Sequence, residues 1–382
     1  MSVEHQGKKR VHIRWQTAQP VSVRMGEVTE ATSCILSIYC NDTHAFCGHG
    51  NGTVGVYNLG SGQLTRNLAL PEGMLGNPNI WSHRHGTHCP MQVVGSKEVV
   101  AAAIEHSKVV VWSSQGQMEQ LHSLNVQNYS CSNDSCEHRA VIHTEIRSVG
   151  VVERSKVAIL VDQVEIKERC SKSPKVSLIL LEKVNCRWEN KNLGCFPGVH
   201  SCSLATDCTW LALLVGQHKK IKLWRGNESQ QDIFLTESDG KLVKSQVGMF
   251  IETPHIILSI PMGISALIKV YKMEATLLHL IRSFRFGIDW TGLDCRLRPI
   301  GNKFCLRFVE THHDRMATIV HLFEKRKLFA AGLSPDETGR RIEVEGFPVA
   351  INSYCLLSFY SKEEEIEQEV ARMGLMKKDF WI

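Results

Sequence analysis

The sequence predicts an all-β protein, a seven-bladed β-propeller, and three observations lead to this fold. A five-residue signature recurs, in which apolar residues alternate with variable ones and an aromatic residue comes last. A turn separates each signature from an apolar run before it, and further short runs flank the pair. Four short antiparallel strands per repeat make one propeller blade. Six copies of the signature are 53–57, 108–112, 177–181, 220–224, 267–271 and 319–323, and a degraded seventh copy is 377–381.

The first unit shows the four strands most clearly. Its signature is Thr53–Tyr57, and the apolar run His44–Gly48 precedes it. Asn51-Gly52 lies between them and favours a tight hairpin, because such a turn needs positive φ at both central residues. Ser33–Tyr39 and Gln63–Leu70 supply the first and fourth strands. We therefore expect one antiparallel sheet over residues 33–70.

The later units repeat this order. Leu181 takes the aromatic position of the third signature, and successive signatures end 43 to 69 residues apart. Compact repeats of this type span roughly 40–45 residues, so we expect the excess in loops. First strands are predicted at 91–94, 201–204, 247–251 and 293–297, second strands at 99–104 and 210–215, and outermost strands at 118–124, 232–235, 277–284 and 328–331.

The two ends of the chain are expected to close the ring. The seventh unit has candidate strands at 347–351 and 354–360, and its signature strand, 376–382, ends the sequence without a fourth strand. Val21–Met25 stands just before the first unit. Docking this strand onto the last blade removes two open sheet edges. We expect an N-terminal arm at 1–19 and a propeller at 20–382, with the last blade closed by the N-terminal strand.

Two insertions interrupt the repeat. Residues 125–145 read as a polar loop that contains Cys131, Cys136, His138 and His143. Residues 362–374 read as a helix, because acidic residues fill its first turns and Gly374 can end it. This helix is either an exposed structural insertion or a docking element for a partner.

Composition indicates a soluble globular protein. The chain has 382 residues, 43% of them hydrophobic, and a net charge of +5 carried by scattered basic residues. We therefore expect neither nucleic acid nor membrane partners. The apolar run 256–268 is too short and too interrupted for a membrane span. Fourteen cysteines without a CxxC pair, and no secretion signal, favour free thiols in a reducing compartment, cytoplasmic or nuclear.

Candidate catalytic and metal-binding residues have structural alternatives. Gly48-x-Gly50-x-Gly52 lies in a hairpin turn and opens no helix, so it lacks the element that a phosphate loop requires. His312-His313-Asp314 resembles a connecting turn, and the sequence has neither G-x-S-x-G nor HExxH. We expect a protein that is not an enzyme and holds no cofactor or metal. Zinc remains the alternative at two clusters: His83, His85, His88 and Cys89, and Cys131, Cys136, His138 and His143.

The first unit resembles a WD repeat over His44–Gly62, and Trp210–Trp224 is similar. No copy of the signature ends in the Trp-Asp pair of strong repeats: Trp112, for example, is followed by Ser113 instead of Asp. The family's buried His-Ser/Asp network is therefore expected to be absent, and packing is expected to hold the blades together instead.

The entry segment Arg14–Met25 faintly resembles the stretch that joins an F-box to its propeller in F-box WD-repeat proteins. That resemblance implies a substrate-recognition propeller, which hands its substrate to a cullin-based ubiquitin ligase if an F-box lies upstream. The twenty residues before the propeller are too few for an F-box. The alternative is a scaffold subunit of a multiprotein complex without a ubiquitin role.

Loops of a propeller carry its binding residues, so the expected partners are proteins or peptide motifs. Basic side chains on inter-strand loops would read acidic or phosphorylated side chains. The candidates for this role are Arg84, Arg225 and Arg340.

Overall fold

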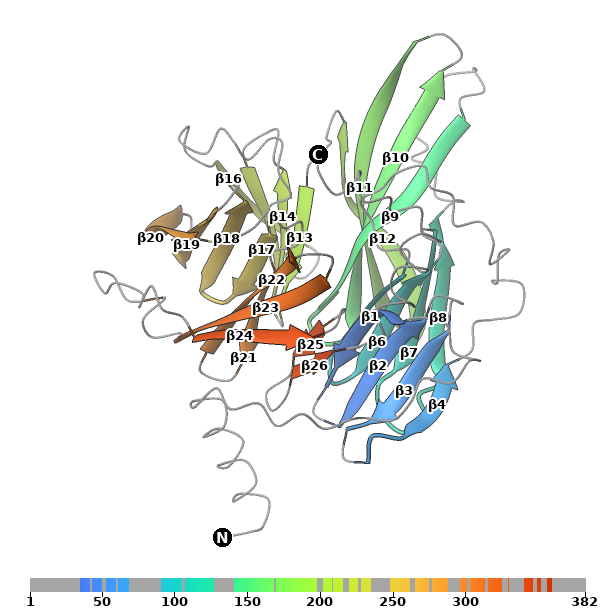
Figure 1. Cartoon of the computed structure of the whole chain (residues 1–382). Coiled ribbons are helices and arrows are strands. Elements are labelled where there is room, and N and C mark those ends of the chain that lie inside the picture. Colours follow the sequence, from blue (N-terminus) through green and yellow to red (C-terminus); the bar gives the residue numbers. More distant parts are fainter. Residues whose placement is uncertain are drawn as a thin grey trace.

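The computed structural model describes residues between 35 and 358, and its longest gaps are 69–90, 127–140, 235–247, 288–295 and 330–339, with shorter gaps in turns. The described chain forms six four-stranded antiparallel sheets and one two-stranded sheet, arranged around a centre (Figure 1). In every four-stranded sheet the strands lie side by side in sequence order. Among the described residues, no helix has the length and apolar character that crossing a membrane requires.

The first three sheets come from the N-terminal half of the chain. The first contains β1 (Ile35–Cys40), β2 (His44–His49), β3 (Val54–Asn58) and β4 (Leu64–Leu68). The second contains β5 (Met91–Gly95), β6 (Val99–Ile104), β7 (Lys108–Ser113) and β8 (Gln120–Asn125). The third has longer strands: β9 (Val141–Val152), β10 (Lys156–Lys167), β11 (Cys170–Val184) and β12 (Arg187–Pro197).

The remaining sheets follow in order. The fourth contains β13 (Cys202–Thr206), β14 (Trp210–Val215), β15 (Lys220–Arg225) and β16 (Glu228–Phe234). The fifth contains β17 (Gly248–Glu252), β18 (His255–Pro261), β19 (Ser265–Glu274) and β20 (Leu277–Gly287). The sixth contains β21 (Arg296–Ile300), β22 (Lys303–His312), β23 (Arg315–Glu324) and β24 (Arg340–Glu345). The last pair is β25 (Val349–Ile351) and β26 (Leu356–Ser358).

The first strands of the sheets form the inner wall of a ring. β1 contacts β5, β5 contacts β9, and the contacts continue through β13 and β17 to β21. β25 contacts β1, so the last described sheet lies beside the first, as the red and blue elements of Figure 1 show. This arrangement is a β-propeller and confirms the predicted fold class. The seventh signature and the closing strand Val21–Met25 lie outside the described residues, as does the predicted helix at 362–374.

The signature forms the third strand of each four-stranded sheet, as predicted, and its alternation packs the sheets against each other. Its second and fourth residues, such as Ile221 and Leu223, face the next sheet. Its aromatic residue faces the preceding sheet, where Trp112 and Trp224 are 2% exposed. Each of the four interfaces from the first sheet to the fifth is therefore an apolar layer. Such layers supply most of the stabilisation of the ring, since burying apolar area is the dominant favourable term in folding.

A β-bulge recurs at one position of the repeat. In the first, second, fourth and fifth sheets, the outer strand holds one extra residue opposite the step from the fourth to the fifth signature residue. A bulge bends its strand and increases the local twist, which blunts an exposed sheet edge. These four units therefore share the pairing of their third and outer strands around this position. The extra residues are Thr65, Leu121, Gln230 and Ile281.

Two expectations differ from the structure. The outer strand of the sixth sheet is Arg340–Glu345, so the prediction of 328–331 is wrong. Phe329 is helical instead, and its ring stacks on that of His255 with centroids 3.9 Å apart. The alternation of Ile342 and Val344 with charged residues suits an edge strand better. His143 lies in β9 rather than in a loop, because β9 already begins at Val141.

Candidate functional site

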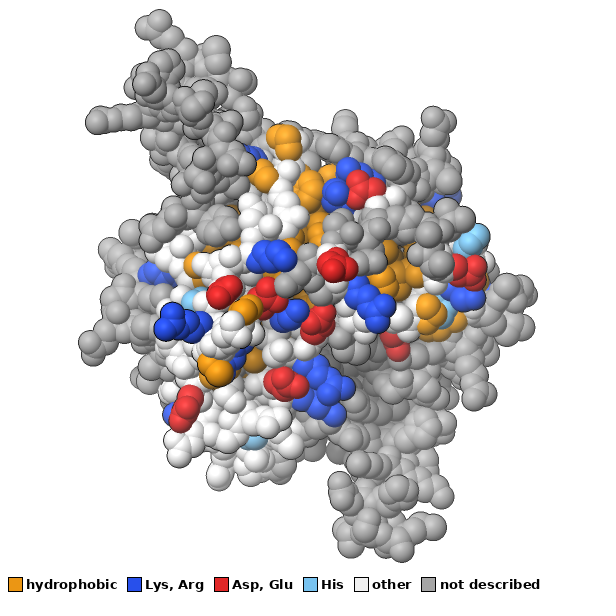
Figure 2. Space-filling model, turned by 180° about the vertical axis from the view of Figure 1, so that it is seen from behind, with side chains coloured by type: hydrophobic (Ala, Val, Ile, Leu, Met, Phe, Trp, Pro, Cys, Tyr) orange, Lys and Arg blue, Asp and Glu red, His pale blue; other side chains and the backbone are white. Residues whose placement is uncertain are grey.

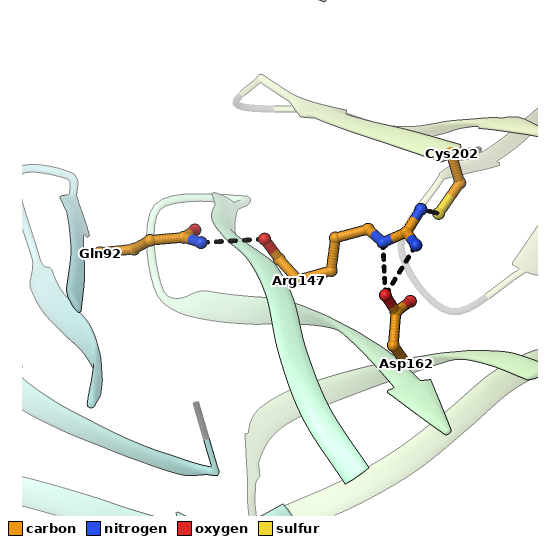
Figure 3. A network of polar contacts seen from close by, with 4 residues as sticks. All are labelled: Gln92, Arg147, Asp162 and Cys202. Carbon is orange, nitrogen blue, oxygen red and sulfur yellow. Dashed lines mark hydrogen bonds and ion pairs between the residues drawn. The ribbon is translucent and has the colours of Figure 1, made fainter. Parts of the chain in front are cut away.

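A polar network links the inner strands of three consecutive sheets (Figure 3). Arg147 on β9 lies at its centre, and its Nε and Nη2 are 2.8 and 2.6 Å from Oδ2 of Asp162 on β10. Nη1 of Arg147 donates to Sγ of Cys202 on β13, over 3.0 Å. On the other side, Nε2 of Gln92 on β5 donates to the carbonyl of Arg147 over 2.9 Å. These contacts connect the second, third and fourth sheets.

A β-bulge gives Arg147 its direction. Ile146 pairs with Val161 and Ser148 pairs with Leu160, so Arg147 is the extra residue between them. Bulges locally re-aim side chains and are frequent next to functional sites. Here the bulge turns the guanidinium toward Asp162 and the neighbouring sheet. A regular ladder would keep strict alternation between the two faces at this position.

The charges of this network are compensated within it. Burial alone would lower the pKa of Arg147, but the Cys202 thiol and the Asp162 carboxylate raise it, so the guanidinium stays charged. Burial raises the pKa of Cys202 to about 11, although Arg147 acts in the opposite direction. The thiolate is the reactive form of cysteine, so Cys202 is not an activated nucleophile at neutral pH. The network is therefore suited to holding the sheets together rather than to covalent chemistry.

Side chains also bridge the turns at one end of the sheets. The connections between first and second strands and between third and fourth strands share this end, which we call the turn face. Oδ1 of Asp207 accepts from the amides of Thr209 and Trp210, and Oδ2 accepts from the amide and hydroxyl of Thr253, at 3.0 and 2.7 Å. Asp207 thus closes its own turn and holds the equivalent turn of the fifth sheet. Ser96 in the second sheet does the same, because its hydroxyl donates to the carbonyl of Arg154 in the third.

Close approach of the inner strands adds to these bridges. A Cβ on Gly95 at the end of β5 would lie 2.5 Å from Cε1 of Tyr39 on β1. A Cβ on Gly150 of β9 would lie 2.8 Å from Cγ2 of Thr206 on β13. Only glycine allows this spacing without a shift of the neighbouring side chain. These polar bridges and tight contacts add to the packing that the sequence predicts to hold the blades together.

The structure brings two of the three predicted binding arginines to the turn face. Arg225 is the exposed last residue of β15, where the connection to β16 begins. Arg340 is the first residue of β24 and pairs with Leu322, so it follows the corresponding connection of the sixth sheet. Both are strand ends rather than loop residues. Arg84 lies outside the described residues.

Most residues of the two predicted metal clusters lie outside the described residues. His83, His85, His88 and Cys89 lie outside it, as do Cys131, Cys136 and His138. Within the described ranges, no three His, Cys, Asp or Glu side chains are placed to share a metal ion. Five described cysteines are free thiols, and Cys186 is the exposed one among them.

Sequence reasoning missed the network around Arg147. Arg147, Asp162 and Gln92 sit in strand-like runs and look like ordinary outward-facing residues. The one available signal was Asp162 itself, a charged residue directly after the apolar run Val157–Val161, which marks a partly buried carboxylate that needs a partner. Nothing in the sequence identified Arg147 as that partner.

The surface of the described residues is mixed in charge. Figure 2 shows lysine and arginine side chains interspersed with aspartate and glutamate, and apolar side chains between them. Several of the basic residues form ion pairs, such as Lys222 with Asp232 at 2.7 Å and Lys156 with Glu153 at 2.9 Å. A nucleic-acid surface carries clustered positive charge instead.

No known protein-family profile matches the chain, and no curated protein matches its sequence. Among solved structures, the β-propeller domain of Cps50 (Swd1) from Myceliophteria thermophila is similar, with 10% identity, a TM-score of 0.49, and coverage of 84% of this chain and 90% of that one. The WD40 domain of SCAP from fission yeast has 9% identity, a TM-score of 0.42, and coverage of 86% and 78%. Sqt1 from Saccharomyces cerevisiae has 12% identity, a TM-score of 0.40, and coverage of 81% and 84%. By its own strand topology, the chain is a β-propeller.

Proposed function

We propose that this protein is a non-catalytic interaction module that binds acidic or phosphorylated peptide segments on its turn face. The observation that supports this most directly is the fixed position of that face. Asp207 and Ser96 hold adjacent turns together, and Arg225 and Arg340 stand at strand ends on the same side of the ring. A rigid surface lowers the entropy lost on binding. Guanidinium groups match carboxylates and phosphates in two-pronged hydrogen bonding.

Charge reversal tests this proposal. The probe is an array of phosphoserine peptides, printed beside the same peptides with unmodified serine. We expect phosphoserine-dependent binding by the full chain, and a loss of at least about tenfold in a variant that combines Arg225→Glu with Arg340→Glu. Arg66→Glu is the matched control, because Arg66 is exposed in the middle of β4 and away from the turn face. Equal binding by the double variant and the control would rule out these arginines as the readers.

For the wider role, we propose a substrate receptor resembling the propellers of F-box ubiquitin ligases, acting in the cytoplasm or nucleus. The free cysteines support the reducing location. Affinity purification of the tagged chain from its own cells, followed by mass spectrometry, tests the receptor role. A cullin and its adaptor should co-purify, and blocking cullin activation should raise the level of the bound substrate. Stable complexes without these subunits would leave only the scaffold function.

A further inference from the structure

The outer strand of the fifth sheet, β20, is unusual among the outer strands of the ring. Among the described strands it pairs with β19 alone and forms the outer edge of its sheet. Leu280 on this strand is 50% exposed, the largest exposed fraction among the large hydrophobic side chains of the described residues. An open strand edge presents a row of backbone donors and acceptors that another strand can pair with.

The other outer strands are shorter than β20 or carry acidic side chains, whereas the charged side chains of β20 are all basic. β4 and β8 have only five and six residues. β12 matches β20 in length but carries Glu189, Asn190 and Lys191 in its exposed stretch. β16 and β24 each contain acidic residues. β20 has eleven residues, begins Leu-Leu-His-Leu-Ile, and contains no acidic residue. Short length and charge are the usual means by which proteins prevent edge pairing.

The bulge of β20 leaves a regular stretch of strand before the bulged residue and another after it. Ile281 is the extra residue, so Leu277–Leu280 precede it and Arg282–Gly287 follow it. In β4, β8 and β16 the corresponding bulge follows the first one or two residues of the strand. The edge of β20 therefore keeps two regular stretches of at least four residues.

One face of β20 continues the apolar layer between the fourth and fifth sheets out to the surface. Leu280 pairs with Tyr271, and Leu278 pairs with Met273, so all four lie on the face directed toward the fourth sheet. Tyr271 belongs to the buried cluster between these sheets, and Met273 and Leu278 pack against it. Leu280 extends this layer beyond the cluster. Exposed Arg285, which pairs with Leu267 of the same layer, lies further along that face.

We propose that β20 accepts an extended strand from a partner protein, whose aliphatic side chains cover Leu280 and whose carboxylates reach Arg285. The backbone edge requires a strand as occupant, and the apolar strip beside it selects the side chains. A second copy of β20 is a poor occupant, because this strand contains no acidic residue and would bring no carboxylate to Arg285. This inference rests on the proposed function as a protein-binding module, but it concerns a different surface.

A designed peptide tests the proposal by fluorescence anisotropy on the full chain. The probe is a labelled Thr-Val-Thr-Val-Thr-Glu-Thr-Glu-Thr peptide, together with its reversed sequence, since the strand could run in either direction. We expect one of them to bind, and Leu280→Asp to weaken this binding by about tenfold or more through loss of apolar contact and charge repulsion. Leu64→Asp on β4 is the matched control, because Leu64 is 44% exposed on another outer strand. This variant should bind the peptide as well as the unchanged chain does.

A backbone test keeps the result independent of how the variants fold. Peptides N-methylated at every second residue keep their side chains but lose the amide donors on one edge, so one of the two methylation patterns should abolish binding. A lysine-for-glutamate peptide should also fail. Absence of binding by both directions, or binding unaffected by N-methylation or by Leu280→Asp, overturns the proposal. Sedimentation showing a dimer that Leu280→Asp dissociates would assign the edge to a second copy and overturn it too.

Testing the same protein on the phosphoserine array distinguishes the failure of the β20 proposal from the failure of the turn-face proposal. A chain that binds the array but neither strand peptide disproves the β20 edge alone. A chain that binds a strand peptide but not the array disproves the turn face alone.

Discussion

Replacing Arg147 with methionine should destabilise the ring, because it leaves the Asp162 carboxylate without its cation. The side chains of Arg147 and Asp162 are 16% and 20% exposed, so this pair lies between a surface pair and a buried one. Breaking a buried pair costs about 3–5 kcal/mol, and an exposed pair contributes about 1 kcal/mol or less. We expect Arg147→Met to lower the free energy of unfolding by about 2–3 kcal/mol.

Urea denaturation at pH 7, followed by circular dichroism, measures this loss. Cys202→Ala is the control, because it removes one contact of Arg147 and leaves the ion pair with Asp162, so it should cost about 1 kcal/mol. Adding Asp162→Val to Arg147→Met should recover part of the stability, since the unpaired carboxylate is then gone. A loss below about 0.5 kcal/mol for Arg147→Met, or no recovery in the double variant, would refute the reasoning.

Three further predictions concern other contacts of the ring. Gly95→Ala should cost about 1–3 kcal/mol in urea denaturation by pushing against Tyr39, and Tyr39→Ala should relieve this added cost if the clash is its cause. A thiol reagent at pH 8 should modify exposed Cys186 quickly in the folded chain but Cys202 only on unfolding, because burial raises the pKa of Cys202 to about 11. Equal modification rates for the two thiols in the folded chain would contradict the burial of Cys202. Burial lowers the pKa of His122 from 6.5, so the stability that neutral His122 contributes is present above that pH and falls as the pH decreases. His122→Leu should remove this part of the pH dependence, measured as the free energy of unfolding at pH 7.5 and at pH 5. The same pH dependence in the variant would disprove the role of His122.

Much of the fold was predictable because one short pattern specifies a strand and its two faces. The alternation at Lys220–Trp224 fixed the third strand of the fourth sheet and its neighbours at once. The outer strand of the sixth sheet escaped this reasoning. Leu328–Ala331 is apolar, but Phe329 is helical and stacks on His255, a contact with a residue far away in sequence. Periodicity within the chain carries no information about such a partner.

The candidate site was much less predictable than the fold. Arg225 and Arg340 were chosen for charge near turns, and their common end of the ring follows from strand order. The contacts of Arg147 depend on a bulge and on side chains from three sheets. A bulge shifts one residue without leaving a mark in a pattern of apolar and polar residues. Strand order can therefore be read from the sequence, whereas side-chain bridges between sheets require coordinates.

The shared bulge has a consequence for how this ring can be altered. Since Thr65, Leu121, Gln230 and Ile281 occupy equivalent places, the third and outer strands of their units pair in the same register. A hybrid in which one whole unit is exchanged for another, cut at the long connections between units, would keep every strand in phase. A cut that deleted or duplicated the bulged residue would shift part of the outer strand by one position and turn its side chains to the opposite face. Modular exchange is thus permitted at some boundaries of this chain and forbidden at others.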